Sequence, residues 1–252
     1  MLDTYITIVM YFLAFGLVGW ALSLYLKNVT HVDSMWALFP LLGSVVCIQK
    51  FPLNSLELIF SFFIILWSLR LFLYLTKRNW GKQEDKRYQV IRQNNEPFFK
   101  YKSPYIIFWL QAMMASVLMI SIIPIYTDNL SINPISIIGI SIAFFGLAYE
   151  AIADWQLARF LKNNKNQVMD QGLWYHSRHP NYFGEFLVWW GIYLISFNGL
   201  YSFTILSPLL MSLLLFKVSG AELLESTIVS RRPGYEKYIQ DTSMFFPWFK
   251  KK

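Results

Sequence analysis

The chain has 252 residues, of which 56% are hydrophobic, 19% aromatic and only 15% charged. Soluble domains carry about 25% charged residues, so this composition excludes an ordinary soluble domain and predicts a polytopic membrane protein. The many aromatic residues exclude disorder, and the single cysteine, Cys47, excludes a disulfide-stapled fold. A net charge of +7 would suggest nucleic acid as a partner of a soluble protein, but here the placement of the charges decides its meaning.

Seven apolar segments predict an all-α fold with seven transmembrane helices. The first, 5–26, has 22 uncharged residues, enough to cross about 30 Å of hydrocarbon. A cleavable signal peptide has a basic start, whereas this one carries Asp3, so we expect the helix to be retained. The other segments are 35–49, 56–75, 104–126, 132–160, 182–197 and 203–218. No long linker divides them, so we expect a single domain over 1–252, with its signature region at about 150–252.

The positive charges lie on alternate connections between these segments. The turn at Lys27, the stretches 76–103 and 161–180, and the tail hold 19 of the 22 Lys and Arg residues, counting Lys217 with the tail. Because positive loops stay in the cytoplasm, this bias predicts an outside N-terminus and a cytoplasmic C-terminus. We therefore expect an integral membrane protein with its active site facing the cytoplasm. The net positive charge then reflects the membrane topology, and no nucleic acid is expected as a partner.

Two carboxylates interrupt the fifth segment near its cytoplasmic end. Glu150 and Asp154 are four residues apart, so they lie on one face of a helix. Ionisable side chains inside a bilayer are costly and by default mark function. One interpretation is a pair that is solvated near the headgroups or balanced by Arg159. The other is a polar wall of a ligand cavity, where Asp154 accepts hydrogen bonds from hydroxyl or amide groups of a ligand.

The densest cluster of polar side chains lies between Gly172 and Glu185. Pro180 predicts a helix start, because the N–H that proline lacks would be unpaired there anyway. The free N–H groups of a first turn suit a phosphate, and Arg178 adds a charged fork for the same anion. Asn181 and Glu185 project one turn apart on a single face. The alternative is an anchor at the membrane interface, made of the aromatic residues Trp174, Tyr175 and Tyr182.

Two further tracts are weaker taken alone. The run 79–88 is rich in charges, and its bland interpretation is a solvated surface segment. The tail carries Glu225 and an Arg-Arg-Pro-Gly-Tyr sequence at 231–235. The chain has no dinucleotide-binding glycine motif, phosphate-binding loop or nucleophile elbow. Its three histidines (His31, His176 and His179) do not form a metal-ligand set, so no metal is predicted.

These tracts together resemble a known family. The stretch 172–185, which ends in Ser-Arg-His-Pro-Asn-Tyr-Phe-Gly-Glu, is similar to the signature of the bacterial steroid 5-alpha-reductase-like proteins, the DUF1295 group. The tracts 79–88, 150–156, 219–225 and 232–238 extend the resemblance over most of the chain in the right order. The Arg-His-Pro core by itself is less specific, because sterol reductases and isoprenylcysteine and phospholipid methyltransferases share a similar sequence.

The resemblance implies an integral membrane reductase that holds NADPH in a cytoplasm-facing cavity of the helical bundle. In the family's eukaryotic members, hydride passes to the β-carbon of a 3-oxo-4-ene steroid while an acidic residue and a tyrosine assist at the carbonyl oxygen. A steroid or another hydrophobic enone lipid is therefore the expected substrate, and the acidic position corresponds to Asp33. The implied cofactor contacts are Arg70, Arg87, Glu150, Asp154, Arg178, His179, Asn181, Tyr182, Glu185, Arg231, Arg232 and Tyr235.

Two positions depart from the family pattern. The catalytic tyrosine position falls on Trp67, so we expect Tyr74 or Tyr88 to take that role. The family's Tyr-x-x-Arg-Thr-Ser tail has Asp241 in place of its arginine, so Arg231 or Arg232 would have to compensate. For Asp33 the alternative role is an ordinary helix N-cap, since aspartate is favoured there.

Two other functions stay open on the sequence. The shared Arg-His-Pro motif also fits an S-adenosylmethionine-dependent methyltransferase that acts on a lipid or a prenyl-cysteine carboxylate. The absence of a tyrosine at position 67 also fits a lipid-binding membrane protein without catalytic activity.

Overall fold

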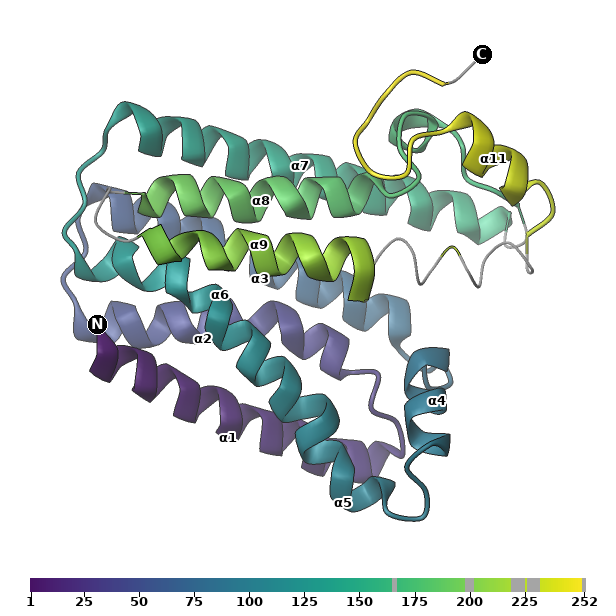
Figure 1. Ribbon diagram of the computed structural model, residues 1–252, viewed down its shortest axis with the longest axis horizontal. Coiled ribbons are helices and arrows are strands. Elements are labelled where there is room, and N and C mark those ends of the chain that lie inside the picture. Colours follow the sequence, from purple (N-terminus) through teal and green to yellow (C-terminus); the bar gives the residue numbers. More distant parts are fainter. Residues whose placement is uncertain (165–166, 198–201, 219–224, 226–231, 251–252) are drawn as a thin grey trace. The chain divides into compact units, whose positions relative to one another are not determined.

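The computed structural model describes residues 1–164, 167–197, 202–218, 225 and 232–250. The chain forms two compact units, Met1–Ile132 (unit 1) and Asn133–Lys252 (unit 2). Within the described ranges every regular element is a helix, which confirms the predicted all-α fold class (Figure 1).

Unit 1 is built from four long apolar helices and a short helix, α4, that lies between the third and the fourth. Its elements are α1 (Leu2–Leu26), α2 (Val32–Lys50), α3 (Ser55–Asn79), α4 (Lys86–Gln93), α5 (Phe99–Ser103), the π-helical turn η1 (Pro104–Trp109) and α6 (Leu110–Thr127). Helix α1 ends at Lys27, whose left-handed backbone (φ 51°) directs its N–H to the carbonyl of Ser23. Helix α3 begins with a capping box, in which Asn54 accepts from the Leu56 N–H and donates its own N–H to Glu57.

The core of unit 1 forms where α2 packs against α1, α3 and α6. The ring of Phe39 lies 4.9 Å from that of Phe12 and 5.4 Å from that of Phe15. Such tilted and edge-to-face pairs add to the gain from burial alone. Between α3 and α6, Ser61 and Tyr126 join their hydroxyl groups at 3.0 Å. Helix α2 is therefore the central helix of this unit.

Unit 2 contains two long antiparallel helices followed by shorter elements. Its elements are α7 (Pro134–Asn163), the 3₁₀ turn η2 (Gly172–Tyr175), α8 (Pro180–Ser196), η3 (Ser202–Ile205), α9 (Leu206–Leu213), η4 (Leu214–Val218) and α11 (Tyr235–Asp241). Asn133 and Ser136 form a capping box at the start of α7. Pro180 is the first residue of α8, as its position in the sequence predicts.

Helices α7 and α8 lie side by side because small residues line their contact (Figure 1). A Cβ atom placed on Gly146 would lie 2.6 Å from the carbonyl oxygen of Gly184. One placed on Gly184 would lie 2.6 Å from the backbone nitrogen of Glu150. Small residues allow this close approach, which is how helices associate in lipid, where no hydrophobic force distinguishes helix from solvent.

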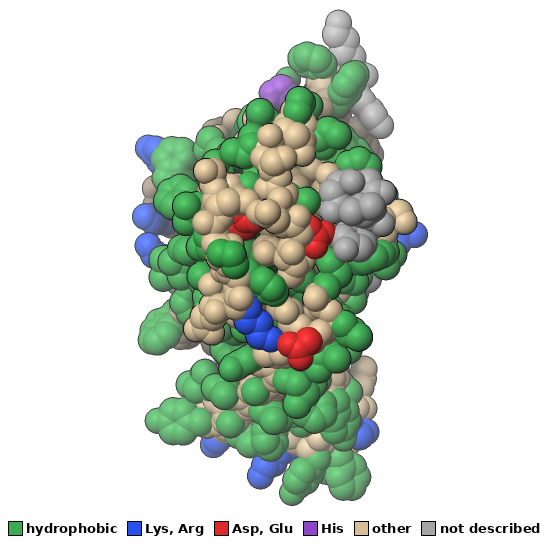
Figure 2. Space-filling model, turned by 90° about the vertical axis from the view of Figure 1, so that its left-hand side faces the viewer, with side chains coloured by type: hydrophobic (Ala, Val, Ile, Leu, Met, Phe, Trp, Pro, Cys, Tyr) green, Lys and Arg blue, Asp and Glu red, His purple; other side chains and the backbone are tan. Residues whose placement is uncertain are grey.

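Among the residues that the structure describes, five helices are long and apolar enough to cross a membrane, which makes the chain an integral membrane protein. They are Leu2–Leu26, Val32–Lys50, Ser55–Asn79, Phe99–Thr127 and Pro134–Asn163. Figure 2 shows hydrophobic side chains over much of one face, with few charged side chains among them. The last two predicted segments are also helical, but α8 has 17 residues and the apolar helix Ser202–Lys217 is likewise shorter than those five.

The polar stretch 76–103 is more structured than its composition indicates. Helix α3 continues to Asn79, α4 occupies Lys86–Gln93, and the fourth long helix begins at Phe99, before the apolar segment itself. Polar composition shows where a chain leaves the bilayer but not whether it remains helical there.

Substitution of Gly184 by alanine tests the close contact of α7 and α8. We expect Gly184→Ala to lower the free energy of unfolding by about 1–3 kcal/mol, because the new methyl group meets backbone and cannot be accommodated by a rotamer change. The measurement is the thermal unfolding midpoint of the full chain in a mild detergent.

Gly16→Ala is the matched control, because a Cβ at that helical position meets its nearest atom, Cδ1 of Trp109, at 3.3 Å. Equal midpoints for the two variants would contradict the tight contact.

Candidate functional site

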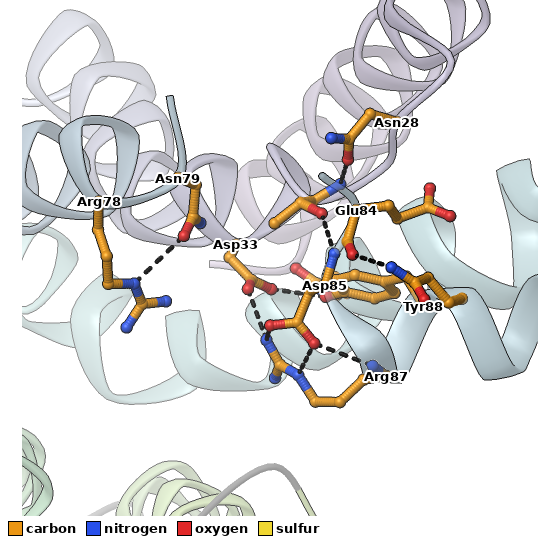
Figure 3. A network of polar contacts seen from close by, with 11 residues as sticks. Asn28, Asp33, Arg78, Asn79, Glu84, Asp85, Arg87 and Tyr88 are labelled. Carbon is orange, nitrogen blue, oxygen red and sulfur yellow. Dashed lines mark hydrogen bonds and ion pairs between the residues drawn. The ribbon is translucent and has the colours of Figure 1, made fainter. Parts of the chain in front are cut away.

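The carboxylate of Asp33 is the centre of a polar network in unit 1 (Figure 3). The Tyr88 hydroxyl donates to Oδ1 of Asp33 at 2.5 Å, and Nη2 of Arg87 donates to Oδ2 at 2.7 Å. The Asp33 side chain is 14% exposed, and Tyr88 is buried. Asp33 is the second residue of α2, and its side chain does not cap the helix, so the N-cap interpretation is wrong.

The segment before Tyr88 is fixed to the turn between α1 and α2. Asp85 caps α4 by accepting from the N–H of Arg87 at 2.9 Å, and it also accepts from Nε of Arg87 at 3.0 Å. The N–H of Asp85 donates to the Thr30 hydroxyl at 2.9 Å, and Glu84 accepts from the N–H of Val29 at 3.0 Å. The second half of the tract 79–88, from Glu84 to Tyr88, is therefore docked through Glu84, Asp85, Arg87 and Tyr88, whereas residues 80–83 are exposed.

The electrostatics of this network keep the phenol neutral and the ion pair charged. Burial and the neighbouring Asp33 carboxylate both raise the pKa of Tyr88 well above its ordinary value. Burial lowers the pKa of the Arg87 guanidinium, but Asp33 and Asp85 outweigh that effect and raise it overall. At neutral pH the network therefore holds a protonated phenol beside a carboxylate that is paired with a cation.

The Tyr88 ring packs among apolar residues, and the guanidinium of Arg87 lies 5.4 Å from its centroid. Tyr88 belongs to a buried cluster with Val29, Val32, Met35, Phe99, Ile107 and Phe108. The Gln111 amide donates to the Tyr88 oxygen at 3.3 Å. Gln111 was not among the predicted site residues, although a lone glutamine in an otherwise apolar span is a signal that could have identified it.

Of the two candidate tyrosines, Tyr88 is the one bonded to Asp33. Tyr74 lies on α3, with the guanidinium of Arg78 5.9 Å from its ring centroid, and Arg70 lies one turn earlier; both Tyr74 and Arg70 are partly buried. Trp67, which occupies the family's tyrosine position, is completely buried on the same helix. The catalytic and cofactor roles expected for these residues stay predictions.

In unit 2, Arg178 and His179 meet the carboxylate of Glu225. Arg178 makes a bidentate pair, with Nε 2.7 Å from Oε1 and Nη2 3.0 Å from Oε2, and Nε2 of His179 lies 2.9 Å from Oε1. Burial alone would raise the pKa of Glu225, but its bonds to His179 and Arg178 lower it overall. The sequence predicts no role for Glu225 beyond its place in the tract 219–225. Its contact with Arg178 and His179 is seen only in the structure.

The signature motif also holds the C-terminal segment. Nη1 of Arg178 donates to the carbonyl of Ile239 at 2.6 Å and to that of Thr242 at 2.8 Å. The Ser177 hydroxyl donates to the carbonyl of Phe245 at 2.7 Å. The Arg178 guanidinium therefore neutralises the partly buried carboxylate of Glu225 and holds the C-terminal segment at the same time.

The tail tyrosines face into unit 2. The Tyr238 hydroxyl donates to the carbonyl of Trp174, and burial raises its pKa. Tyr235 is also buried, with its ring 5.6 Å from that of Tyr238, and burial raises its pKa as well. Its N–H donates to the carbonyl of Arg232 at 3.2 Å. Arg231 lies outside the described residues, so its predicted role is not addressed.

The two carboxylates of α7 are buried, so the solvated interpretation is wrong. Glu150 is 2% exposed and Asp154 is 3% exposed. Asp154 accepts from the Asn181 amide at 3.2 Å across the contact of α7 and α8. Arg159 is exposed, and its guanidinium lies 5.4 Å from the ring centroid of Trp155. The predicted grouping of Asp154 with Asn181 is thus present.

The other residues predicted near Asn181 differ in their surroundings. Tyr182 stacks on the His179 ring, with centroids 5.4 Å apart and planes inclined by 10°. Glu185 is partly buried one turn further along α8. Trp174 is buried and donates to the carbonyl of Ala153 at 3.0 Å, so it packs inward instead of forming an interfacial anchor.

Arg178→Lys tests the structural part of this network. Lysine keeps the charge but loses the bidentate fork and the bonds to two carbonyls. We expect backbone hydrogen exchange over 239–245 to be faster by about tenfold or more, since a hydrogen bond to a charged group contributes about 1.5–3 kcal/mol. Arg159→Lys is the matched control, and the same exchange rates in both variants would contradict a clamp by Arg178.

Comparisons with known proteins place the chain in a family. The model of a family described as "Protein of unknown function (DUF1295)" matches residues 19–242. A fission-yeast protein (Schizosaccharomyces pombe), named Uncharacterized protein C594.04c, is 26% identical over 270 residues, which cover 92% of this chain and 76% of that protein. No solved structure matches the chain. The family match confirms the DUF1295 part of the resemblance read from the tracts between 79 and 238, while the likeness to steroid 5-alpha-reductases stays a prediction; the chain belongs to the DUF1295 family.

Proposed function

We propose that this protein is a membrane-bound, NADPH-dependent reductase of a carbon–carbon double bond conjugated to a carbonyl group, acting on a steroid-like or other hydrophobic enone lipid. One observation carries the proposal: the 2.5 Å hydrogen bond between Tyr88 and Asp33. The sequence lacks the tyrosine expected at position 67, and Tyr88 supplies a phenol at the acidic residue from another element.

The reaction requires a donor at the carbonyl oxygen, where negative charge develops as the β-carbon is reduced. Tyr88 is protonated at neutral pH and can donate there. Asp33 is a positioning residue, because it holds the phenol by accepting the hydrogen bond of its hydroxyl group in the resting state. As charge grows on a nearby carbonyl oxygen, the phenol moves its hydrogen bond from Asp33 to that oxygen. Arg87 holds the other carboxylate oxygen of Asp33, so Oδ1 stays directed at the Tyr88 hydroxyl.

The residues of unit 2 fit a dinucleotide. Asp154 and Asn181 present a carboxylate and an amide, which match the hydroxyl and carboxamide groups of such a cofactor. Helix α8 begins beside them, and the first turn of a helix suits phosphate. Arg178 can contact a phosphate if that anion replaces the Glu225 carboxylate on Nε and Nη2, an exchange of one anion for another. When bound, NADPH supplies the hydride.

The proposed function includes a membrane topology. Seven crossings, made of the five long helices together with α8 and the apolar helix Ser202–Lys217, would place the N-terminus outside and the C-terminus in the cytoplasm. The support is the distribution of Lys and Arg along the sequence. On this topology α4 and the signature motif face the cytoplasm, where NADPH is available, and the membrane is a bacterial inner membrane.

Tyr88→Phe and Asp33→Asn test the chemistry. We expect both to lower kcat for an enone substrate, Tyr88→Phe by about 10²–10³-fold, because a lost donor at the developing oxyanion has that effect. The assay follows NADPH oxidation with a 3-oxo-4-ene steroid and a panel of enone lipids, alongside NADPH affinity, which should be unchanged.

Tyr101→Phe is the matched control, since that tyrosine is 65% exposed on α5. Wild-type turnover in Tyr88→Phe, with the protein folded, would remove Tyr88 from the mechanism.

A ligand comparison separates this function from methyl transfer. We expect NADPH to raise the thermal unfolding midpoint. At a concentration 100 times its dissociation constant, mass action raises the free energy of unfolding by about 2.7 kcal/mol. S-adenosylmethionine should leave the midpoint unchanged. Stabilisation by S-adenosylmethionine alone would favour a methyltransferase, and NADPH binding without turnover on any enone would favour a lipid-binding role.

A further inference from the structure

A pocket opens in unit 1 between the end of α1 and the start of α5, next to the buried cluster around Tyr88, with which it shares Val29 and Phe99. Ser23, Leu24 and Lys27 contribute one side of it, and Phe99, Lys100 and Ser103 contribute the other. Val29 and Arg92 complete the lining. The Trp20 indole donates to the carbonyl of Lys100 at 3.1 Å, which fixes the two sides to each other.

Three cations from three elements surround this opening. Arg92 of α4 is paired with Glu84 through two bonds of 2.8 and 2.7 Å, and its guanidinium lies 4.2 Å from the ring centroid of Phe99. Lys27 and Lys100 are exposed, and neither makes an ion pair with any residue that the structure describes. With Glu84 counted against Arg92, Lys27 and Lys100 leave two positive charges among the lining residues, and Glu96 also acts electrostatically on Arg92.

The pocket lies where two candidate membrane spans end. One span is Leu2–Leu26, directly before Lys27, and the other is Phe99–Thr127, which begins with the pocket's own Phe99. Leu24 and Tyr25 beside it are 37% and 83% exposed. Exposed apolar and aromatic side chains next to basic ones are typical of the level where lipid headgroups meet the acyl chains.

We propose that this pocket binds a phosphate group carried by an anionic phospholipid headgroup. The shape of the site supports this source, because a headgroup can place its phosphate between Lys27 and Lys100 while its acyl chains run along the exposed apolar side of α1. A free phosphate ion has the same chemistry at the cations but gains nothing from the apolar flank. The Ser23 and Ser103 hydroxyls donate to the backbone carbonyls of Trp20 and Lys100, so the ammonium groups are the donors that remain for the ligand.

The test uses the full chain in a neutral detergent and three probes: phosphatidylglycerol, phosphatidylcholine and inorganic phosphate. Native mass spectrometry measures bound lipid, and the thermal unfolding midpoint measures stabilisation. We expect phosphatidylglycerol to bind more tightly than phosphatidylcholine. The double variant Lys27→Gln/Lys100→Gln should weaken phosphatidylglycerol binding by about 10- to 30-fold, as the loss of two surface cations predicts.

Lys82→Gln/Lys86→Gln is the matched control, since it removes two exposed lysines from the same polar stretch but outside the pocket lining. It should change binding by less than about twofold. Equal weakening in the two double variants would overturn the proposal, because binding would then follow net charge alone. If inorganic phosphate at millimolar concentration displaces the lipid from wild type, the cation site stands but the lipid source is overturned.

Discussion

The hydrogen bonds that Asp33 accepts from Tyr88 and Arg87 determine how unit 1 accommodates charge. A carboxylate in so apolar a chain is stable only when cations and donors surround it, and an unpaired one would destabilise the fold. Those donors come from α4, so the segment after α3 must fold back onto the α1–α2 turn. The positions of Glu84 and Asp85 follow from the same requirement, because their bonds to Val29 and Thr30 hold α4 in place.

Unit 2 meets the same constraint in a different way. Arg178 and His179 neutralise Glu225, and the remaining donors of Arg178 bind carbonyls of the C-terminal segment. The small residues between α7 and α8 bring the two backbones close enough for Asp154 and Asn181 to bond. Each unit therefore pairs its principal charged groups through a few residues that are distant in sequence. These few residues are also the ones that the proposed reductase would use.

Much of the fold follows from sequence pattern, since uncharged runs long enough to cross a bilayer can form little else. Asp33 and the Arg-His-Pro motif also stand out in the sequence as polar residues in or beside apolar segments. The sequence does not show which residues they contact. Tyr88 lies 55 residues from Asp33, and Glu225 lies 47 from Arg178, and no periodicity predicts contacts at such separations. The sequence pattern of the tract 79–88 indicates a solvated segment, because the partners of its charged residues are distant in sequence and meet them only in the fold.

The central claim is that the Tyr88–Asp33 pair supports reduction of an enone by NADPH. The most direct measurement supplies NADPH deuterated at the transferred position together with a 3-oxo-4-ene steroid, and locates deuterium in the product by mass spectrometry and NMR. The account predicts deuterium at the β-carbon with wild-type protein and a sharply reduced yield with Tyr88→Phe. A product without deuterium, or equal yields from the two proteins, would contradict it.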